Sequence, residues 1–138
     1  MQYLHINYLA ALVAAVAAFV LGWLWYSPML LGKAWVAANG YTPEKIAAMQ
    51  KGAVRAYGVS FACFVVMAVV LAVLLRITHI TAVPAGAKLG LLCWLGFVAT
   101  TGLTANVYSD KPLKAWGLDA GYQLVYFVVM ALILTVWR

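Results

Sequence analysis

Residues 4–26 read LHINYLAALVAAVAAFVLGWLWY and contain no Asp, Glu, Lys or Arg. An α-helix needs ~20 mostly apolar residues to cross the hydrocarbon core of a bilayer, and this run is long enough. It lacks the basic leading segment of a signal peptide, and it exceeds the roughly 7–15 apolar residues of a signal core. We therefore predict that residues 4–26 form a retained membrane-spanning helix.

Three further stretches have the same character, at about residues 57–75, 89–108 and 120–137. Of the 138 residues, 67% are hydrophobic and only 9% are charged, whereas soluble domains carry roughly 25% charged residues. A soluble fold of this size could not bury so much apolar surface. The sequence therefore predicts an all-α polytopic membrane protein, with one transmembrane domain over residues 1–138 and four spans.

The distribution of basic residues predicts an orientation for the spans. Six of them fall in the connections between spans 1 and 2 and between spans 3 and 4: Lys33, Lys45, Lys51, Arg55, Lys111 and Lys114. The opposite side carries three: Arg76, Lys88 and Arg138. The positive-inside rule then places both connections in the cytoplasm and both termini outside it. The formal net charge of +6 predicts membrane lipids, including anionic headgroups, as partners. A basic run with interleaved aromatics is missing, which argues against nucleic-acid binding.

The connection between spans 1 and 2 contains a helix signal of its own. Pro28 should end the first span, and Thr42-Pro43-Glu44 is typical of an N-cap, a first-position proline and an acidic first turn. Apolar side chains then recur on one face: Ile46, Met49, Ala53 and Tyr57. This pattern predicts an amphipathic helix on the cytoplasmic surface that leads into span 2. A solvated helical extension is the alternative interpretation.

Small residues recur every four positions in the first span, at Ala10, Ala14, Ala18 and Gly22, with Asn7 near its start. Such spacing lets helix backbones approach closely in lipid. A unit of four helices has little interior, so we expect some small-residue faces to serve a homo-oligomer.

The chain also contains an apparent internal repeat. Lys33-Ala34-Trp35 is followed by Gly40-Tyr41, and Lys114-Ala115-Trp116 is followed by Gly121-Tyr122 at the same spacing. A duplicated pair of helices would be related by an axis along the membrane normal. The alternative is chance, because Lys, Trp, Tyr and Gly are all common at membrane interfaces.

Polar side chains within the spans concentrate toward the predicted cytoplasmic side. We predict that they form a pocket open to the cytoplasm, made of Ser27, Ser60, Thr100, Thr101, Thr104, Asn106 and Gln123, with a rim of Lys33, Asp110, Lys111 and Asp119. The alternative is a set of ordinary interhelical hydrogen bonds. Aromatic residues near the span ends are predicted to anchor the helices at the interface: Trp25, Tyr26, Trp35, Tyr108 and Trp116.

The residues argue against several kinds of chemistry. Cys63 and Cys93 lie near opposite ends of their spans, too far apart for a disulfide. His5 and His79, without nearby carboxylates or thiols, make a poor metal site. A proton-coupled pump needs an intramembrane acid or histidine relay, and Glu44, Asp110 and Asp119 fall in the connections or at the interface. We therefore predict no catalytic residue, no metal and no cofactor.

Several motifs together resemble a known family. They are Asn7-Tyr8, Trp25-Tyr26-Ser27-Pro28, Gly32-Lys33-Ala34-Trp35, Trp94-Leu95-Gly96-Phe97, Asn106, Lys111-Pro112 and Gly121-Tyr122. This pattern resembles the small bacterial and fungal membrane proteins called domain of unknown function 1761, over nearly the whole chain. The resemblance implies a four-helix unit in a bacterial inner membrane, and it implies no activity.

Three functions are compatible with these features. The first is a self-associating, non-catalytic membrane module with a cytoplasmic pocket for a small ligand or lipid. The second is a passive channel or uniporter lined by Thr100, Thr101, Thr104, Asn106 and Asn7. The third is a lipid-modifying enzyme that uses Asp110, Lys111, Lys114 and Asp119 at the interface.

Overall fold

The computed structural model describes residues 4–138, which are helical over most of their length. In chain order the elements are α1 (Tyr8–Trp25), α2 (Gly32–Asn39), α3 (Pro43–Lys51), α4 (Ala53–Ile77), α5 (Val83–Cys93), η1 (Trp94–Ala99), α6 (Thr100–Tyr108) and α7 (Leu113–Val136). Four stretches are long and apolar enough to cross a membrane: Tyr8–Trp25, Ala53–Ile77, Val83–Tyr108 and Leu113–Val136. The prediction of an all-α protein with four spans is confirmed.

Three of the four spans are longer than the apolar stretches from which they were predicted. Spans 2, 3 and 4 begin earlier than predicted, at Ala53, Val83 and Leu113, because a helix continues through polar residues once its first turn has formed. Span 1 begins later, at Tyr8, since the side chain of Asn7 caps it by accepting a 3.0 Å hydrogen bond from the Ala10 amide.

Span 3 is made of three consecutive elements, because the π-helical segment η1 joins α5 to α6. Two indole groups connect this segment to span 4. Trp94 Nε1 donates to the carbonyl of Ala120 at 2.9 Å, and Trp116 Nε1 donates to the carbonyl of Ala99 at 3.0 Å. These bonds fix the position of span 3 against α7 in lipid, where water cannot replace them.

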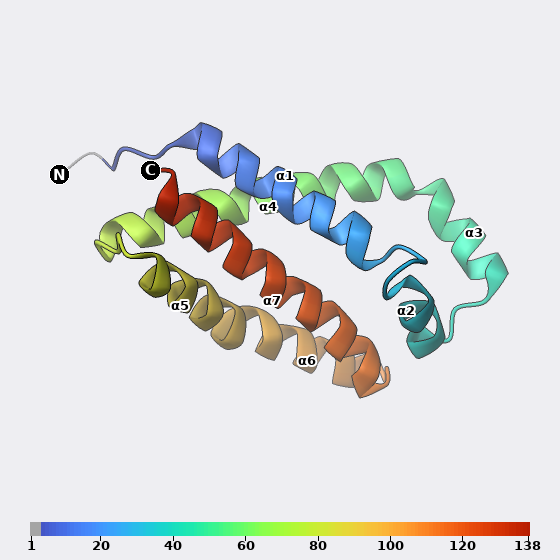
Figure 1. Cartoon of the computed structure of the whole chain (residues 1–138). Coiled ribbons are helices and arrows are strands. Elements are labelled where there is room, and N and C mark those ends of the chain that lie inside the picture. Colours follow the sequence, from blue (N-terminus) through green and yellow to red (C-terminus); the bar gives the residue numbers. More distant parts are fainter. Residues whose placement is uncertain (1–3) are drawn as a thin grey trace.

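Helix α7 is the centre of the bundle. It packs along α1, α4 and α5, whereas α5 and α4 make only slight contact. Figure 1 shows α7 between α1 and the α5–α6 span, and the view from above shows α4 running alongside α1. The buried core includes Leu71, Leu75 and Met130. Many other large apolar side chains of the spans are exposed, as expected for helices surrounded by lipid.

The row of small residues in α1 is used inside the chain. Ala10, Ala14 and Ala18 are 0% exposed and belong to the common core, and a Cβ on Gly22 would come within 2.5 Å of the Tyr122 hydroxyl. Close approach of α1 to its neighbours therefore depends on this row. Because the row is buried in one chain, it lends no support to a homo-oligomer, which stays a prediction.

The two copies of the apparent repeat differ in their surroundings. Each Lys-Ala-Trp motif lies near the start of a helix, in α2 and in α7. Helix α2 ends at Gly40, which has a left-handed φ of 67°, whereas α7 continues past Gly121 to Val136. Within the two copies the packing is alike, since α1 contacts α4 about as extensively as α5 contacts α7. Between the copies it differs, since α1 contacts α7 extensively and the corresponding pair, α5 and α4, makes little contact. The duplication therefore stays a prediction.

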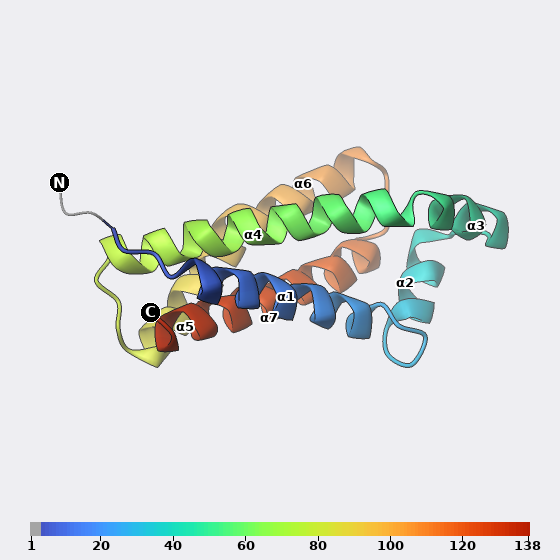
Figure 2. The same cartoon turned by 90° about the horizontal axis from the view of Figure 1, so that it is seen from above.

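The connection between spans 1 and 2 folds into two helices at the end of the bundle opposite the chain termini (Figures 1 and 2). The predicted amphipathic helix is α3: Thr42 accepts a 3.2 Å hydrogen bond from the Lys45 amide, Pro43 opens the helix and Glu44 follows. Sequence reasoning missed α2, whose 8 residues are too few to show helical periodicity.

Candidate functional site

A cavity lies between two walls at the α2–α3 end of the bundle. One wall is formed by the end of α1 and by α2, and the other by α3 and the start of α4. The volume is about 790 Å³, and the lining side chains are mostly apolar or aromatic. This volume lies within the roughly 300–1,000 Å³ of typical small-molecule sites.

Asp119 of α7 supplies the acidic group of the cavity. Its Oδ1 accepts hydrogen bonds from the Tyr26 hydroxyl at 2.6 Å and from Trp35 Nε1 at 3.1 Å. Tyr26 lies one residue beyond span 1. Burial, followed by the bond to Asp119, raises the pKa of the Tyr26 hydroxyl above its ordinary value, so this hydroxyl stays protonated and remains the donor.

The end of α1 is fixed on α7 by two further hydrogen bonds. Trp25 Nε1 donates to the carbonyl of Leu118 at 3.1 Å, and the buried Tyr122 hydroxyl donates to the carbonyl of Ala18 at 2.7 Å. The ring of Tyr122 also meets that of Tyr26 edge-on, with centroids 5.3 Å apart. The position of Tyr26 beside Asp119 is therefore set by the packing of α1 against α7.

A tight turn then brings α2 back over the end of α1. The amides of Leu30 and Gly32 both donate to the carbonyl of Ser27, at 3.1 and 3.0 Å. Gly32 is buried, and a Cβ there would collide with the backbone oxygens of Tyr26 and Ser27. This close approach is open only to glycine, and it places the Trp35 ring edge-on to that of Tyr26, with centroids 5.6 Å apart.

We expect Gly32→Ala to disturb this turn and to displace α2, because the atoms in the way are backbone and cannot move aside. The cost should be about 1–3 kcal/mol, measured as a lower midpoint of thermal unfolding in mild detergent. Gly52→Ala is the matched control in the same connection, since the nearest atom to its Cβ is 3.9 Å away. Equal midpoints for the two variants would contradict this account of the turn.

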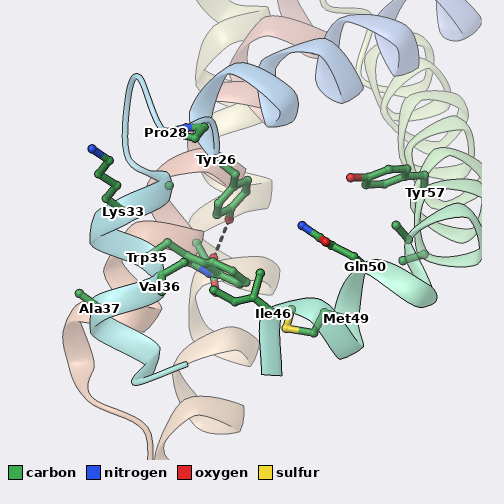
Figure 3. Close-up of a pocket in the computed structure, with 14 residues that line it drawn as sticks. Tyr26, Pro28, Lys33, Trp35, Val36, Ala37, Ile46, Met49, Gln50 and Tyr57 are labelled. Atoms are coloured by element: carbon green, nitrogen blue, oxygen red, sulfur yellow. Dashed lines mark hydrogen bonds between the residues drawn. The ribbon is translucent and has the colours of Figure 1, made fainter. Parts of the chain in front are cut away.

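The opposite wall carries the apolar face predicted for the amphipathic segment. Ile46, Met49, Ala53 and Tyr57 all line the cavity. In Figure 3 the Tyr57 hydroxyl and the Gln50 amide point across the cavity toward the Tyr26 side, whereas the Lys33 amine points away from it. This apolar face therefore lines a cavity formed by the chain itself. The sequence had predicted that the helix lies on the membrane surface.

The structure disperses the seven residues predicted to form a polar pocket. None of them, all within the described residues 4–138, lines the cavity. Three are exposed threonines whose hydroxyls donate to carbonyls of their own helix: Thr100 to Gly96, Thr101 to Phe97 and Thr104 to Thr100. A threonine can satisfy its hydroxyl in this way without any partner helix, so polarity alone did not indicate an inward direction.

The other four predicted pocket residues also lie apart from the cavity. Asn106 is buried and donates from Nδ2 to the carbonyl of Pro112 at 3.2 Å, which closes the turn between α6 and α7. The Ser27 hydroxyl donates to the carbonyl of Leu24 at 2.8 Å. Ser60 is exposed on α4, and Gln123 is half-buried on α7. Asn7, which was also named for a channel, caps α1 near the opposite end of the bundle.

The predicted rim is divided between two places. Lys33 and Asp119 line the cavity. Asp110 is exposed in the turn before α7, with a φ of 53°, and the Lys111 amine lies 5.9 Å from the centroid of the Tyr41 ring. Of the four residues named for acid–base chemistry, Asp119 lines the cavity, whereas Asp110, Lys111 and Lys114 do not.

The predicted interfacial aromatics have roles that sequence reasoning did not identify. Trp25, Tyr26, Trp35 and Trp116 each donate a hydrogen bond within the protein, and Tyr108 is 87% exposed. A signal was present for two of them: Tyr26 and Trp35 each carry one polar hydrogen in an apolar setting, which usually finds a partner when buried. Cys63 and Cys93 are both free, as predicted.

Comparison with known proteins gives a family and nothing more specific. The family model described as "Protein of unknown function (DUF1761)" matches residues 9–135. Neither a curated protein nor a solved structure matches the chain.

Proposed function

The chain belongs to the DUF1761 family, whose description assigns no activity, and we propose from the cavity that it is a multi-pass membrane protein which binds an amphiphilic molecule. The observation that carries this proposal is a cavity of about 790 Å³ that combines apolar walls with a carboxylate at one side. Small-molecule sites have this composition, with few polar groups placed to orient the ligand.

The position of the cavity favours an amphiphile over a fully soluble ligand. It lies where α1 ends and α4 begins, close to the ends of two spans. Helix ends of this kind lie near the boundary between hydrocarbon and headgroups. An amphiphile could then place its chain against Ile46, Met49 and Tyr57 and its polar head beside Asp119.

The side of the membrane on which the cavity opens is part of the proposal. The α2–α3 end carries six of the nine basic residues, so the positive-inside rule favours a cytoplasmic position for it. The same rule favours termini outside the cytoplasm. Self-association is a separate proposal, tested by cross-linking in membranes, with a uniform monomer as the adverse result.

The amphiphile proposal is tested by filling the cavity. Ala56 lines it, and Ala62 lies six residues further along α4, exposed and outside the cavity. Dodecyl probes carrying a photoactivated diazirine in the chain, with ammonium, maltoside or phosphate heads, are cross-linked to protein in nanodiscs. Peptide mapping locates the labelled residues.

We expect labelling of the α3 and α4 wall, with a loss of about tenfold or more for Ala56→Phe, because an aromatic ring would occupy the volume the ligand needs. Ala62→Phe should label like the unchanged protein. If the two variants label equally with all three probes, the cavity binds no amphiphile and the proposal is wrong.

A further inference from the structure

We infer that the cavity selects amphiphiles with a positively charged ammonium head. This inference rests on the proposed function, and it names the class of ligand that the same site would take. Its basis is the juxtaposition of the Asp119 carboxylate with the aromatic rings of Tyr26, Trp35 and Tyr57 around one space.

The Asp119 carboxylate has an oxygen available to a ligand. Both protein donors, Tyr26 and Trp35, bind Oδ1. Within the described residues, Oδ2 accepts no hydrogen bond. Every fully buried side-chain oxygen in that part of the chain has a hydrogen-bond partner, so an oxygen without one is at least partly exposed. Oδ2 is therefore not fully buried, and Asp119 is one of the residues that line the cavity. A carboxylate held in this way has one oxygen for the protein and one for a cation.

Three aromatic rings line the same cavity as Asp119. Tyr26 and Trp35 lie on the same wall as Asp119, and Tyr57 points toward them from the opposite wall (Figure 3). A cation over the face of a Trp or Tyr ring is attracted by the ring quadrupole, and pockets for quaternary ammonium groups use such rings. Apolar residues such as Ile46 and Met49 then remain for the chain of the ligand.

The charge of the cavity opposes that of its surroundings. The chain has a formal net charge of +6, yet the charged side chains that line the cavity are Asp119 and Lys33, and the Lys33 amine points away from the space. An anionic head inside the cavity would lie beside the carboxylate and would be repelled. The lysines outside can attract anionic lipids, whereas the interior favours a cation.

The test uses the three dodecyl probes described above, in nanodiscs made of phosphatidylglycerol. We expect the ammonium probe to label the cavity about tenfold more strongly than the maltoside probe, with the phosphate probe weakest. In Asp119→Asn this preference should disappear, because the amide keeps an oxygen for Tyr26 and Trp35 and loses the charge. Asp110→Asn is the matched control: it removes the same charge from an exposed turn where asparagine tolerates the positive φ, and the preference should persist.

A second variant keeps the test decisive if Asp119→Asn fails to fold. Tyr57→Leu removes a ring from the opposite wall and leaves Asp119 with both of its donors, so the ammonium preference should fall severalfold. Suppose that Ala56→Phe loses the labelling, but that the unchanged protein is labelled equally by all three probes. This result would overturn the ammonium inference and leave the amphiphile proposal standing. Labelling unaffected by Ala56→Phe would overturn both.

The same experiment separates two sources of the ammonium group. Competition by added phosphatidylethanolamine would identify a lipid headgroup as the ligand. Competition by a soluble dodecylammonium alone would identify a cationic amphiphile that is not a membrane phospholipid. Either result supports ammonium recognition, and failure of both competitors to displace the probe would contradict it.

Discussion

Ala68→Leu is expected to destabilise the bundle by about 3 kcal/mol. Ala68 is 0% exposed and lies in the core that α4 shares with α1 and α7. Interiors packed to this density have no room for the additional carbons of leucine, and overpacking of such a site typically costs about 1–3 kcal/mol. The value should be near the top of that range, because α4 would have to move away from both neighbouring helices.

The measurement is unfolding by sodium dodecyl sulfate in mixed micelles, followed by far-ultraviolet circular dichroism. Ala62→Leu provides the same substitution on the exposed side of the same helix, and its effect should stay within about 0.5 kcal/mol. A small effect at Ala68, or equal effects at both positions, would show that α4 does not pack against α1 and α7 as described.

Asp119→Ala is expected to release α2 from the end of the bundle. The substitution removes the oxygen that accepts from both Tyr26 and Trp35 and leaves two partly buried donors without a partner. Hydrogen bonds to charged groups contribute about 1.5–3 kcal/mol each, so the population with α2 detached should rise at least about tenfold. Trypsin cleavage at Lys33, Lys45 or Lys51, in or near α2 and α3, measures this population.

Asp119→Asn separates the structural role of this residue from its charge. The amide oxygen can still accept from Tyr26 and Trp35, so we expect cleavage to stay within a fewfold of the unchanged protein. Rapid cleavage of Asp119→Asn would mean that α2 is held by the charge itself. Slow cleavage of Asp119→Ala would mean that the two hydrogen bonds do not hold α2, and that the packing of Trp35 against Tyr26 is sufficient.

The candidate site was only partly predictable, and the reason lies in particular residues. The apolar face from Ile46 to Tyr57 was visible in the sequence because helical periodicity is local, and its members line the cavity. Asp119 was identified as a polar residue near the interface, but its partners Tyr26 and Trp35 lie 93 and 84 positions away in the chain. No local pattern encodes a pairing over that separation.

The residues of the predicted polar pocket show what depth along a span leaves undetermined. Thr100, Thr101 and Thr104 lie at similar depth along one helix, yet each hydroxyl donates to a carbonyl of its own helix and stays exposed. Asn106 closes a turn instead of facing other spans. Depth along a span follows from the sequence, whereas direction around the helix axis depends on where the neighbouring helices lie.

By itself the sequence determined the class of the protein, the four spans, the cap and apolar face of α3, and the family. Each of these follows from the transfer of side chains into hydrocarbon, from local backbone hydrogen bonding or from motifs contiguous in the chain. Only the tertiary structure decided that α7 is central, that the alanine row of α1 is buried within one chain, and that Asp119 meets Tyr26 and Trp35 beside a cavity. Those features depend on how helices pack, and packing in lipid is set by the fit of side chains that are far apart in the sequence.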